Sequence, residues 1–142
     1  MASIEFFNQD ISFKFPRPRK TKLWIREVIR KEKRELVHLN YIFCSDPYLL
    51  SINEQYLKHK TLTDIITFDH SERTGVIEGD IFISVERVLS NAETLKTDVE
   101  EELCRVVIHG VLHLIGYSDK KPADKLLMRK KENAYLSLRH KM

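Results

Sequence analysis

Two histidines and an aspartate form the run of residues that most directly predicts chemistry in this chain. The run HGVLHLIGYSD covers residues 109–119 and follows the pattern H-x3-H-x2-G-x2-D. Helical side chains four residues apart lie on one face, so His109 and His113 can reach the same ion. Gly116 can end that helix in a left-handed conformation before Asp119. Two imidazoles and a carboxylate are the ligands of a catalytic zinc site whose fourth position is left to water.

Asp119 is the expected third ligand, and three other residues are alternatives that the fold could bring to the same place. They are Asp69, His70 and Asp80. Cys104 is a poor candidate because, five residues before the first histidine, it points well away from the ligand face. A buried polar network is a weaker explanation, since unpaired imidazoles on so apolar a helix would be costly.

A bound divalent metal, expected to be one Zn²⁺, would lower the pKa of its water from 15.7 to about 7 and supply a nucleophile. Hydrolysis of an acyl or a phosphoryl bond is the natural use of such a site. Zinc proteases carry a glutamate directly after the first histidine as general base, and Gly110 occupies that position here. The ligand spacing of this sequence therefore fits a zinc protease, but the general base of such a protease is missing. A glycine there also allows close approach of another backbone.

Charge is divided unevenly along the sequence. Residues 1–34 and 120–142 together carry 18 Lys and Arg against six Asp and Glu, whereas residues 35–119 carry six against 15. An acidic middle that holds a cation, flanked by basic ends, suits a metalloenzyme that acts on a polyanion.

Length and composition indicate one domain over residues 1–142, with 42% hydrophobic residues and only four glycines and four prolines. No apolar run is long enough to span a membrane, and the first ten residues lack the pattern of a secretory signal. Cys44 and Cys104 are too few for a disulfide framework and are expected to be buried thiols. We therefore expect a cytoplasmic protein.

Hydrophobic periodicity and capping residues predict both helices and strands. Ser45, Ser84 and Asp98 are candidate helix caps, and Asp98 with Glu101 resembles a capping box. The helix after Asp98 is apolar on almost every side, so we expect it to be buried, with both histidines near the centre of the domain. Strands are expected at 4–7, 36–44, 63–68 and 76–84, and helices at 20–34, 46–57, 85–95, 99–115 and 122–140.

The histidine run resembles the signature H-G-x-L-H-L-x-G-Y-D-H of the YbeY family, metal-dependent endoribonucleases of ribosomal RNA maturation. Two further segments are similar to family motifs in the same order. Asn53–Tyr56 followed by Thr63–Phe68 resembles N-x-x-Y and T-[DN]-V-L-S-F, and Gly79–Ser84 resembles the G-D-I strand. The resemblance covers roughly residues 50–135.

The resemblance implies an α+β domain with a mixed sheet of about four strands surrounded by helices. The metal site would lie on a long buried helix and the loop after it. It also implies a single-strand-type endoribonuclease that uses metal-activated water in 16S rRNA 3′-end maturation and ribosome biogenesis. The expected partners are ribosomal RNA and ribosomal subunits, with no membrane and no DNA.

Three positions depart from the family pattern. Asp119 replaces the third histidine, Ser118 replaces the aspartate before it, and Leu57 replaces an arginine suited to phosphate binding. An added negative charge at position 119 should weaken the metal's effect on water and could admit iron or manganese. The neighbours of Leu57 are candidates for RNA binding, namely Lys58, His59 and Lys60.

Two alternatives to an endoribonuclease follow from the same residues. One is a zinc peptidase with H-x3-H-x2-G-x2-D ligands, against which Gly110 counts. The other is a non-catalytic ribosome-assembly factor with a structural metal, since Leu57 and Asp119 both remove features of the family.

Overall fold

A mixed four-stranded sheet organises the chain in the computed structural model, which describes residues 2–57 and 63–142. Its strand order is β1-β2-β4-β3, with β1, β2 and β4 parallel and β3 antiparallel to β4. The expected α+β class and mixed sheet are confirmed. Over the described residues, the strands are β1 (Ser3–Asn8), β2 (Glu35–Cys44), β3 (Ile65–Asp69) and β4 (Val76–Ser84), and the helices are α1 (Pro18–Lys31), α2 (Asp46–Leu57), α3 (Val85–Leu95), α4 (Val99–Ile115) and α5 (Pro122–Lys141).

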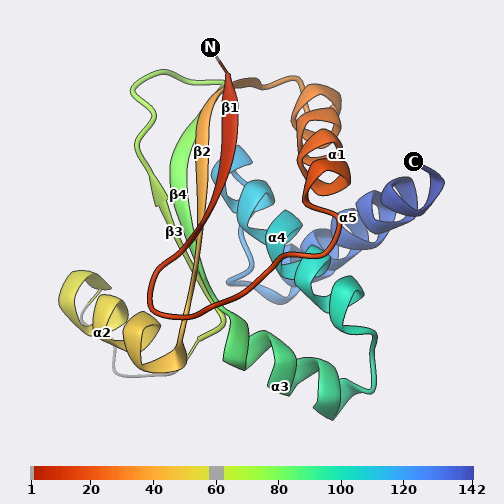
Figure 1. Cartoon of the computed structure of the whole chain (residues 1–142). Helices are drawn as coiled ribbons and strands as arrows, with labels where there is room; N and C mark the ends of the chain where they lie inside the picture. Colours follow the sequence, from red (N-terminus) through yellow and green to blue (C-terminus); the bar gives the residue numbers. More distant parts are fainter. Residues whose placement is uncertain (1, 58–62) are drawn as a thin grey trace.

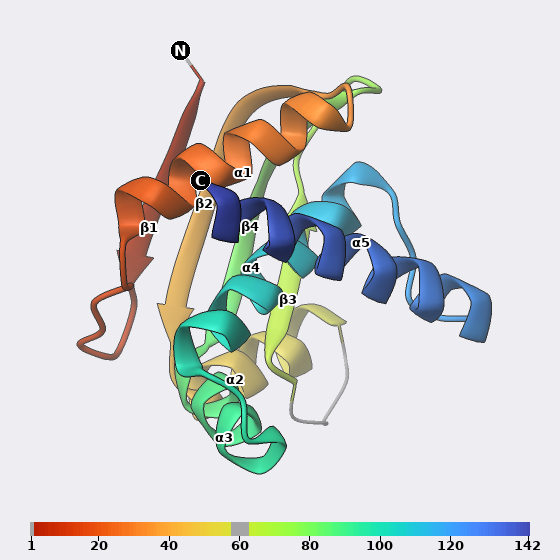
Figure 2. The same cartoon turned by 90° about the vertical axis from the view of Figure 1, so that its right-hand side faces the viewer.

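The helices are distributed unequally over the two faces of the sheet. Helices α1, α4 and α5 lie on one face, and α2 lies at one end of the other (Figure 1). The view turned by 90° shows α4 running between the sheet and α5 (Figure 2). The larger hydrophobic core fills the space between the sheet and these helices, and a smaller one lies under α2.

Alternation along β4 explains how the sheet presents two different faces. Ile77, Gly79, Ile81 and Ile83 are buried, while the residues between them are partly exposed. A period of two places the buried set toward α4 and the other set toward α2. Strand β4 thus contributes side chains to both hydrophobic cores.

The expected helix caps are confirmed. The Ser45 Oγ accepts a hydrogen bond from the Tyr48 N–H at 3.2 Å. The Ser84 Oγ accepts one from the Arg87 N–H at 3.1 Å, and the Asp98 carboxylate accepts one from the Glu101 N–H at 3.2 Å. These side chains satisfy backbone donors that the first turn of a helix leaves unpaired.

The first helix begins earlier than we expected. We expected a helix at 20–34, but α1 starts at Pro18 and ends at Lys31. Proline is well suited to the first turn, where its missing N–H has no helical partner. Lys33, just after the helix, takes a positive φ of 59°, which ends it before residue 34.

Helix α4 is buried along most of its length, as its apolar sequence predicts. Its two histidines are less central than expected, because the side chains of His109 and His113 remain 20% and 26% exposed. They lie on the one stripe of the helix that the core does not cover. A site on α4 therefore combines a rigid support with access to solvent.

The remaining expectations about the fold concern thiols and membrane spans. Cys44 and Cys104 are free and buried, as predicted. Among the described residues, no helix has the length and apolar character that a membrane crossing requires.

Candidate metal centre

The three predicted ligands converge where α4 ends. The Nε2 atoms of His109 and His113 each lie 3.3 Å from the Oδ2 atom of Asp119. The two rings meet edge to face with their centroids 4.6 Å apart. Three donor atoms, one from each side chain, all lie within 4.8 Å of one another.

The spacing of these donor atoms fits a small tetrahedral ion. Two ligand atoms at about 2.0–2.1 Å from a tetrahedral zinc ion lie about 3.3 Å apart. Both histidine-to-aspartate distances have this value. Two imidazole nitrogens and one carboxylate oxygen also match the donor types of catalytic zinc sites, which keep one position open.

A carboxylate from α5 orients the first histidine. The Glu132 Oε2 atom lies 2.7 Å from the Nδ1 atom of His109, and the Glu132 side chain is only 6% exposed. Arg105 donates from Nη1 to Glu132 Oε1 at 2.9 Å and from Nη2 to Asn133 Oδ1 at 2.9 Å. A carboxylate on one ring nitrogen fixes the tautomer that leaves the other nitrogen free to bind a metal. Glu132 thus directs Nε2 of His109 toward Asp119.

Electrostatics around His109 favour a basic imidazole. Burial lowers the pKa of His109, but the hydrogen bond and charge of Glu132, with the charges of Asp119 and Asp64, outweigh it and raise the pKa overall. Burial raises the pKa of Glu132, but its bonds to His109 and Arg105 bring that pKa below its ordinary value. A more basic imidazole is a stronger metal ligand.

The turn that carries Asp119 begins at Gly116. This glycine has a φ of 125°, which side chains rarely tolerate, and its N–H donates to the carbonyls of Leu112 and His113. Tyr117 then donates its hydroxyl to Glu32 Oε1 at 2.7 Å. Glu32 is also bound by Lys131 and Tyr135 of α5. Tyr117 therefore ties the loop, through Glu32, to the end of α1 and to the interior of α5.

Gly110 lets α4 lie close to the sheet. A Cβ atom at this position would lie 2.9 Å from Ile81 Cδ1 and 3.0 Å from Ile65 Cδ1. The close approach expected of this glycine is thus an approach to β3 and β4. A larger side chain there would have to displace Ile81 and Ile65, and the glycine itself cannot act as the general base of a zinc peptidase.

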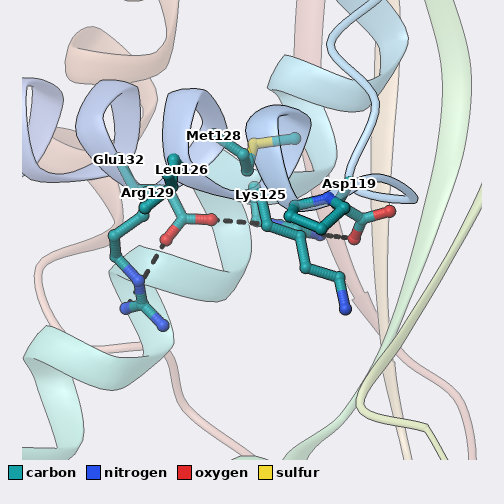
Figure 3. A pocket seen from close by; sticks show the side chains of 8 residues that line it. Asp119, Lys125, Leu126, Met128, Arg129 and Glu132 are labelled. Carbon is teal, nitrogen blue, oxygen red and sulfur yellow. Dashed lines mark hydrogen bonds and ion pairs between the residues drawn. The ribbon is translucent and has the colours of Figure 1, made fainter.

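Three hollows meet at His109 and Asp119. One of about 630 Å³ lies along α5 and includes Lys125 and Arg129 in its lining (Figure 3). A second, of about 270 Å³, reaches toward Asp64 and Glu102, and a third, of about 400 Å³, reaches toward Leu57. His109 and Asp119 line all three. A ligand at the triad therefore has room on several sides.

The alternative third ligands lie elsewhere. His70 Nε2 is 3.1 Å from Asp80 Oδ2, and both residues line a separate hollow beside α2. Asp69 accepts hydrogen bonds from the N–H and hydroxyl groups of Ser71. His70 and Asp80 thus lie on the α2 side of the sheet, and Asp69, the last residue of β3, does not line the hollows beside the histidines.

All three candidates for RNA binding lie outside the described residues, namely Lys58, His59 and Lys60. Their neighbour Leu57, which the sequence comparison placed at the position of the family arginine, lines the hollow beside His113 and Asp119 and is 44% exposed. An apolar side chain thus lies beside the candidate ligands at this position.

Two acidic residues of the site were not foreseen. Glu132 lies in line with the buried residues Met128 and Leu136 of α5, four residues to either side. The sequence does carry a signal for Glu132. A carboxylate on the buried face of a basic helix needs a charged or hydrogen-bonding partner, which indicates a polar site next to it. Asp64 is also partly buried beside the site, and burial raises its pKa despite the opposing charge of His109. The family motif that contains Asp64 gave no indication that it lies beside the metal ligands.

Comparison with known proteins identifies the family. The family model described as Endoribonuclease YbeY matches residues 4–139. The chain belongs to the YbeY endoribonuclease family. It is 50% identical over 137 residues to the Endoribonuclease YbeY of Cytophaga hutchinsonii, covering 96% of both chains. It is 52% identical over 134 residues to that of Flavobacterium psychrophilum, covering 94% of this chain and 95% of the relative.

A solved structure has the same fold. The solution structure of TM1509 from Thermotoga maritima superimposes with a TM-score of 0.65 at 28% identity, covering 94% of this chain and 87% of that one. The YbeY resemblance therefore extends beyond residues 50–135 to almost the whole chain, including the basic N-terminal segment.

Proposed function

We propose that residues 1–142 form one metal-dependent hydrolase domain that cleaves RNA internally, with His109, His113 and Asp119 as the metal ligands. The observation that carries the proposal is the pair of 3.3 Å distances that join both Nε2 atoms to one carboxylate oxygen. Family membership supports RNA as the substrate class. Zn²⁺ is the expected ion because it prefers a tetrahedral set of this size and composition.

Each protein group has a definite task in this proposal. When bound, the metal supplies Lewis acidity and an activated water for attack on phosphorus. Glu132 holds the His109 ring in one orientation, and Arg105 holds Glu132. The Tyr117–Glu32 contact holds the loop that presents Asp119. The hollows beside the triad leave the fourth position accessible.

The biological substrate that we propose is the 3′ end of 16S rRNA, cut in a single-stranded region during ribosome biogenesis in the cytoplasm. Ribosomal RNA and ribosomal subunits would then be the partners. The basic ends of the chain and its membership of the YbeY family support this assignment. A peptidase is disfavoured because Gly110, packed closely against Ile81 and Ile65, occupies the position of the general-base glutamate.

Metal analysis of the purified protein tests the ligands. The wild type should bind about one equivalent of zinc, and His113→Ala and Asp119→Ala should each lose most of it while staying folded. Both variants should lose cleavage of a single-stranded RNA that carries the 16S 3′ sequence. His70→Ala is a matched control, because His70 is a histidine outside the site. Undiminished cleavage by folded His113→Ala would disprove the proposal, and ribosome binding without nuclease activity would favour an assembly factor.

A further inference from the structure

The hollow along α5 is lined by cations on one wall and by metal-capable groups on the other. Lys125 and Arg129 lie four residues apart on α5, and so project from one face of the helix. Both are exposed, and the Arg129 side chain is 61% exposed. Figure 3 shows both side chains extending from α5 in the same direction, beside the Glu132 carboxylate and Asp119.

The cations of this region differ in what they already bind. Arg105 is engaged through both of its terminal nitrogens, with Glu132 and Asn133. The nearest approach of Arg129 to Glu132 is 3.8 Å, which is longer than a hydrogen bond. The guanidinium of Arg129 therefore keeps donors for a ligand, whereas Arg105 is a structural partner of the site.

Among the described residues, the opposite hollow offers no comparable charge. Its described lining, which includes Asn53, Leu57 and Thr63–Thr67, contains no lysine or arginine. Positive charge beside the triad is therefore concentrated, among the described residues, on the α5 side. A polyanion that places one phosphate at the metal would have its neighbouring phosphate neutralised there.

We infer that Lys125 and Arg129 form a phosphate-binding wall that holds the RNA backbone next to the scissile bond and fixes the side from which the strand enters. This inference rests on the proposed RNA substrate. Arg129 would bind a phosphate through two N–H groups and Lys125 through a point charge. The two residues bind substrate and leave the metal set unchanged.

The affinity of the protein for a labelled 20-nucleotide single-stranded RNA tests the inference. Fluorescence anisotropy measures this affinity in EDTA, at salt concentrations from 50 to 200 mM. The double variant Lys125→Ala/Arg129→Ala should bind at least about tenfold more weakly. The slope of log affinity against log salt should fall by about 1.4, the value for two phosphate contacts on a single strand. The control Lys130→Ala/Lys141→Ala removes two exposed charges from the same helix outside this hollow and should nearly retain the wild-type slope.

Metal content and kinetics separate substrate binding from a structural role. The double variant should keep the wild-type zinc content and melting temperature, and its KM for RNA should rise much more than its kcat falls. The conservative variant Arg129→Lys should retain part of the RNA affinity that the alanine substitution removes. Loss of zinc by the double variant, or a salt slope equal to the wild type's, would overturn the inference.

The same experiment separates this inference from the proposed activity. Wild-type protein that binds RNA through these residues but cleaves none with any divalent metal would refute the nuclease and support the phosphate-binding wall. Wild-type cleavage together with undiminished binding by the double variant would refute the wall alone.

Discussion

The imidazole of His109 connects the candidate metal centre to the interior of the protein through its two nitrogens. Nε2 lies 3.3 Å from Asp119, and Nδ1 lies 2.7 Å from Glu132. Glu132 is in turn held by Arg105. The chain of contacts passes from solvent to a carboxylate that is 6% exposed. His109 thus links the candidate ligands to Glu132 of α5.

Glu132→Gln tests this connection at the scale of the residue. The amide keeps the volume of Glu132 but loses its charge, so it should hold the His109 ring less firmly and make it less basic. Zinc affinity should fall by about 10–100-fold. Competition with a chelating dye measures the affinity. Asp124→Asn, a change in another carboxylate of α5, is the control, and equal affinities for Glu132→Gln and the wild type would contradict the role.

At the scale of elements, three helices meet at Glu32. This residue follows α1, accepts from Tyr117 after α4, and binds Lys131 and Tyr135 of α5. Its side chain is 9% exposed. Burial raises the pKa of Glu32, but the hydrogen bonds from both tyrosines and Lys131 outweigh it and lower the pKa overall. The carboxylate form therefore stabilises the packing of α1 against α5.

Glu32→Gln should destabilise the fold by about 1–3 kcal/mol at pH 7, the cost of weakening a buried charged hydrogen-bond group. Because the folded pKa lies below the unfolded one, this contribution is present at neutral pH and is lost as pH falls through the lowered folded pKa. The difference between wild type and variant should thus shrink toward pH 3. Urea unfolding at both pH values measures it.

Glu27→Gln provides the matched control for this experiment. Glu27 lies on α1 and pairs with Arg30 on the surface, where ion pairs contribute little. A gap between wild type and Glu32→Gln that stayed constant from pH 7 to pH 3 would argue against an ionised Glu32 as its source.

Elements with strong local signals were predictable from the sequence. The buried stripe of α4, the caps at Ser84 and Asp98, and the alternation in β4 all depend on neighbours within a few residues. The start of α1 was missed because Pro18 both breaks and begins helices. The pairing of the two candidate ligand histidines was predictable because a single helical turn separates them.

The rest of the site depends on contacts between distant segments. Glu132 reaches His109 across 23 positions, and Tyr117 reaches Glu32 across 85. Such pairs are set by the packing of whole helices, which local periodicity does not specify. The exposure of the histidines was also misjudged, since it depends on where α5 leaves α4 uncovered.

At the scale of the whole molecule, both basic ends of the sequence come to one side. Helices α1 and α5 cover the same face of the sheet as α4 (Figure 1). The acidic middle supplies β2, β3, β4 and the metal-capable groups. This arrangement explains how a chain with a net charge of only +3 can present a local cationic surface beside the candidate site.

Zinc should raise the melting temperature of the whole domain, because it binds the folded chain. At free zinc of 100 times Kd the gain is about 2.7 kcal/mol, which corresponds to several degrees for a domain of this size. Differential scanning calorimetry with and without zinc measures the shift. It should vanish in Asp119→Ala, and an equal shift in that variant would place the bound zinc elsewhere.

The burial of α4 also determines the order in which the protein is assembled. Gly110 and its neighbours pack against the sheet through ordinary hydrophobic contacts, and the larger core includes none of the three candidate ligands. Small zinc domains, by contrast, are unfolded until metal arrives. Because the core of this chain does not depend on the candidate ligands, we expect the chain to fold first and to be loaded afterwards. Scarcity of metal would therefore leave a reserve of intact, idle molecules that regain activity on supply, with no new synthesis or refolding.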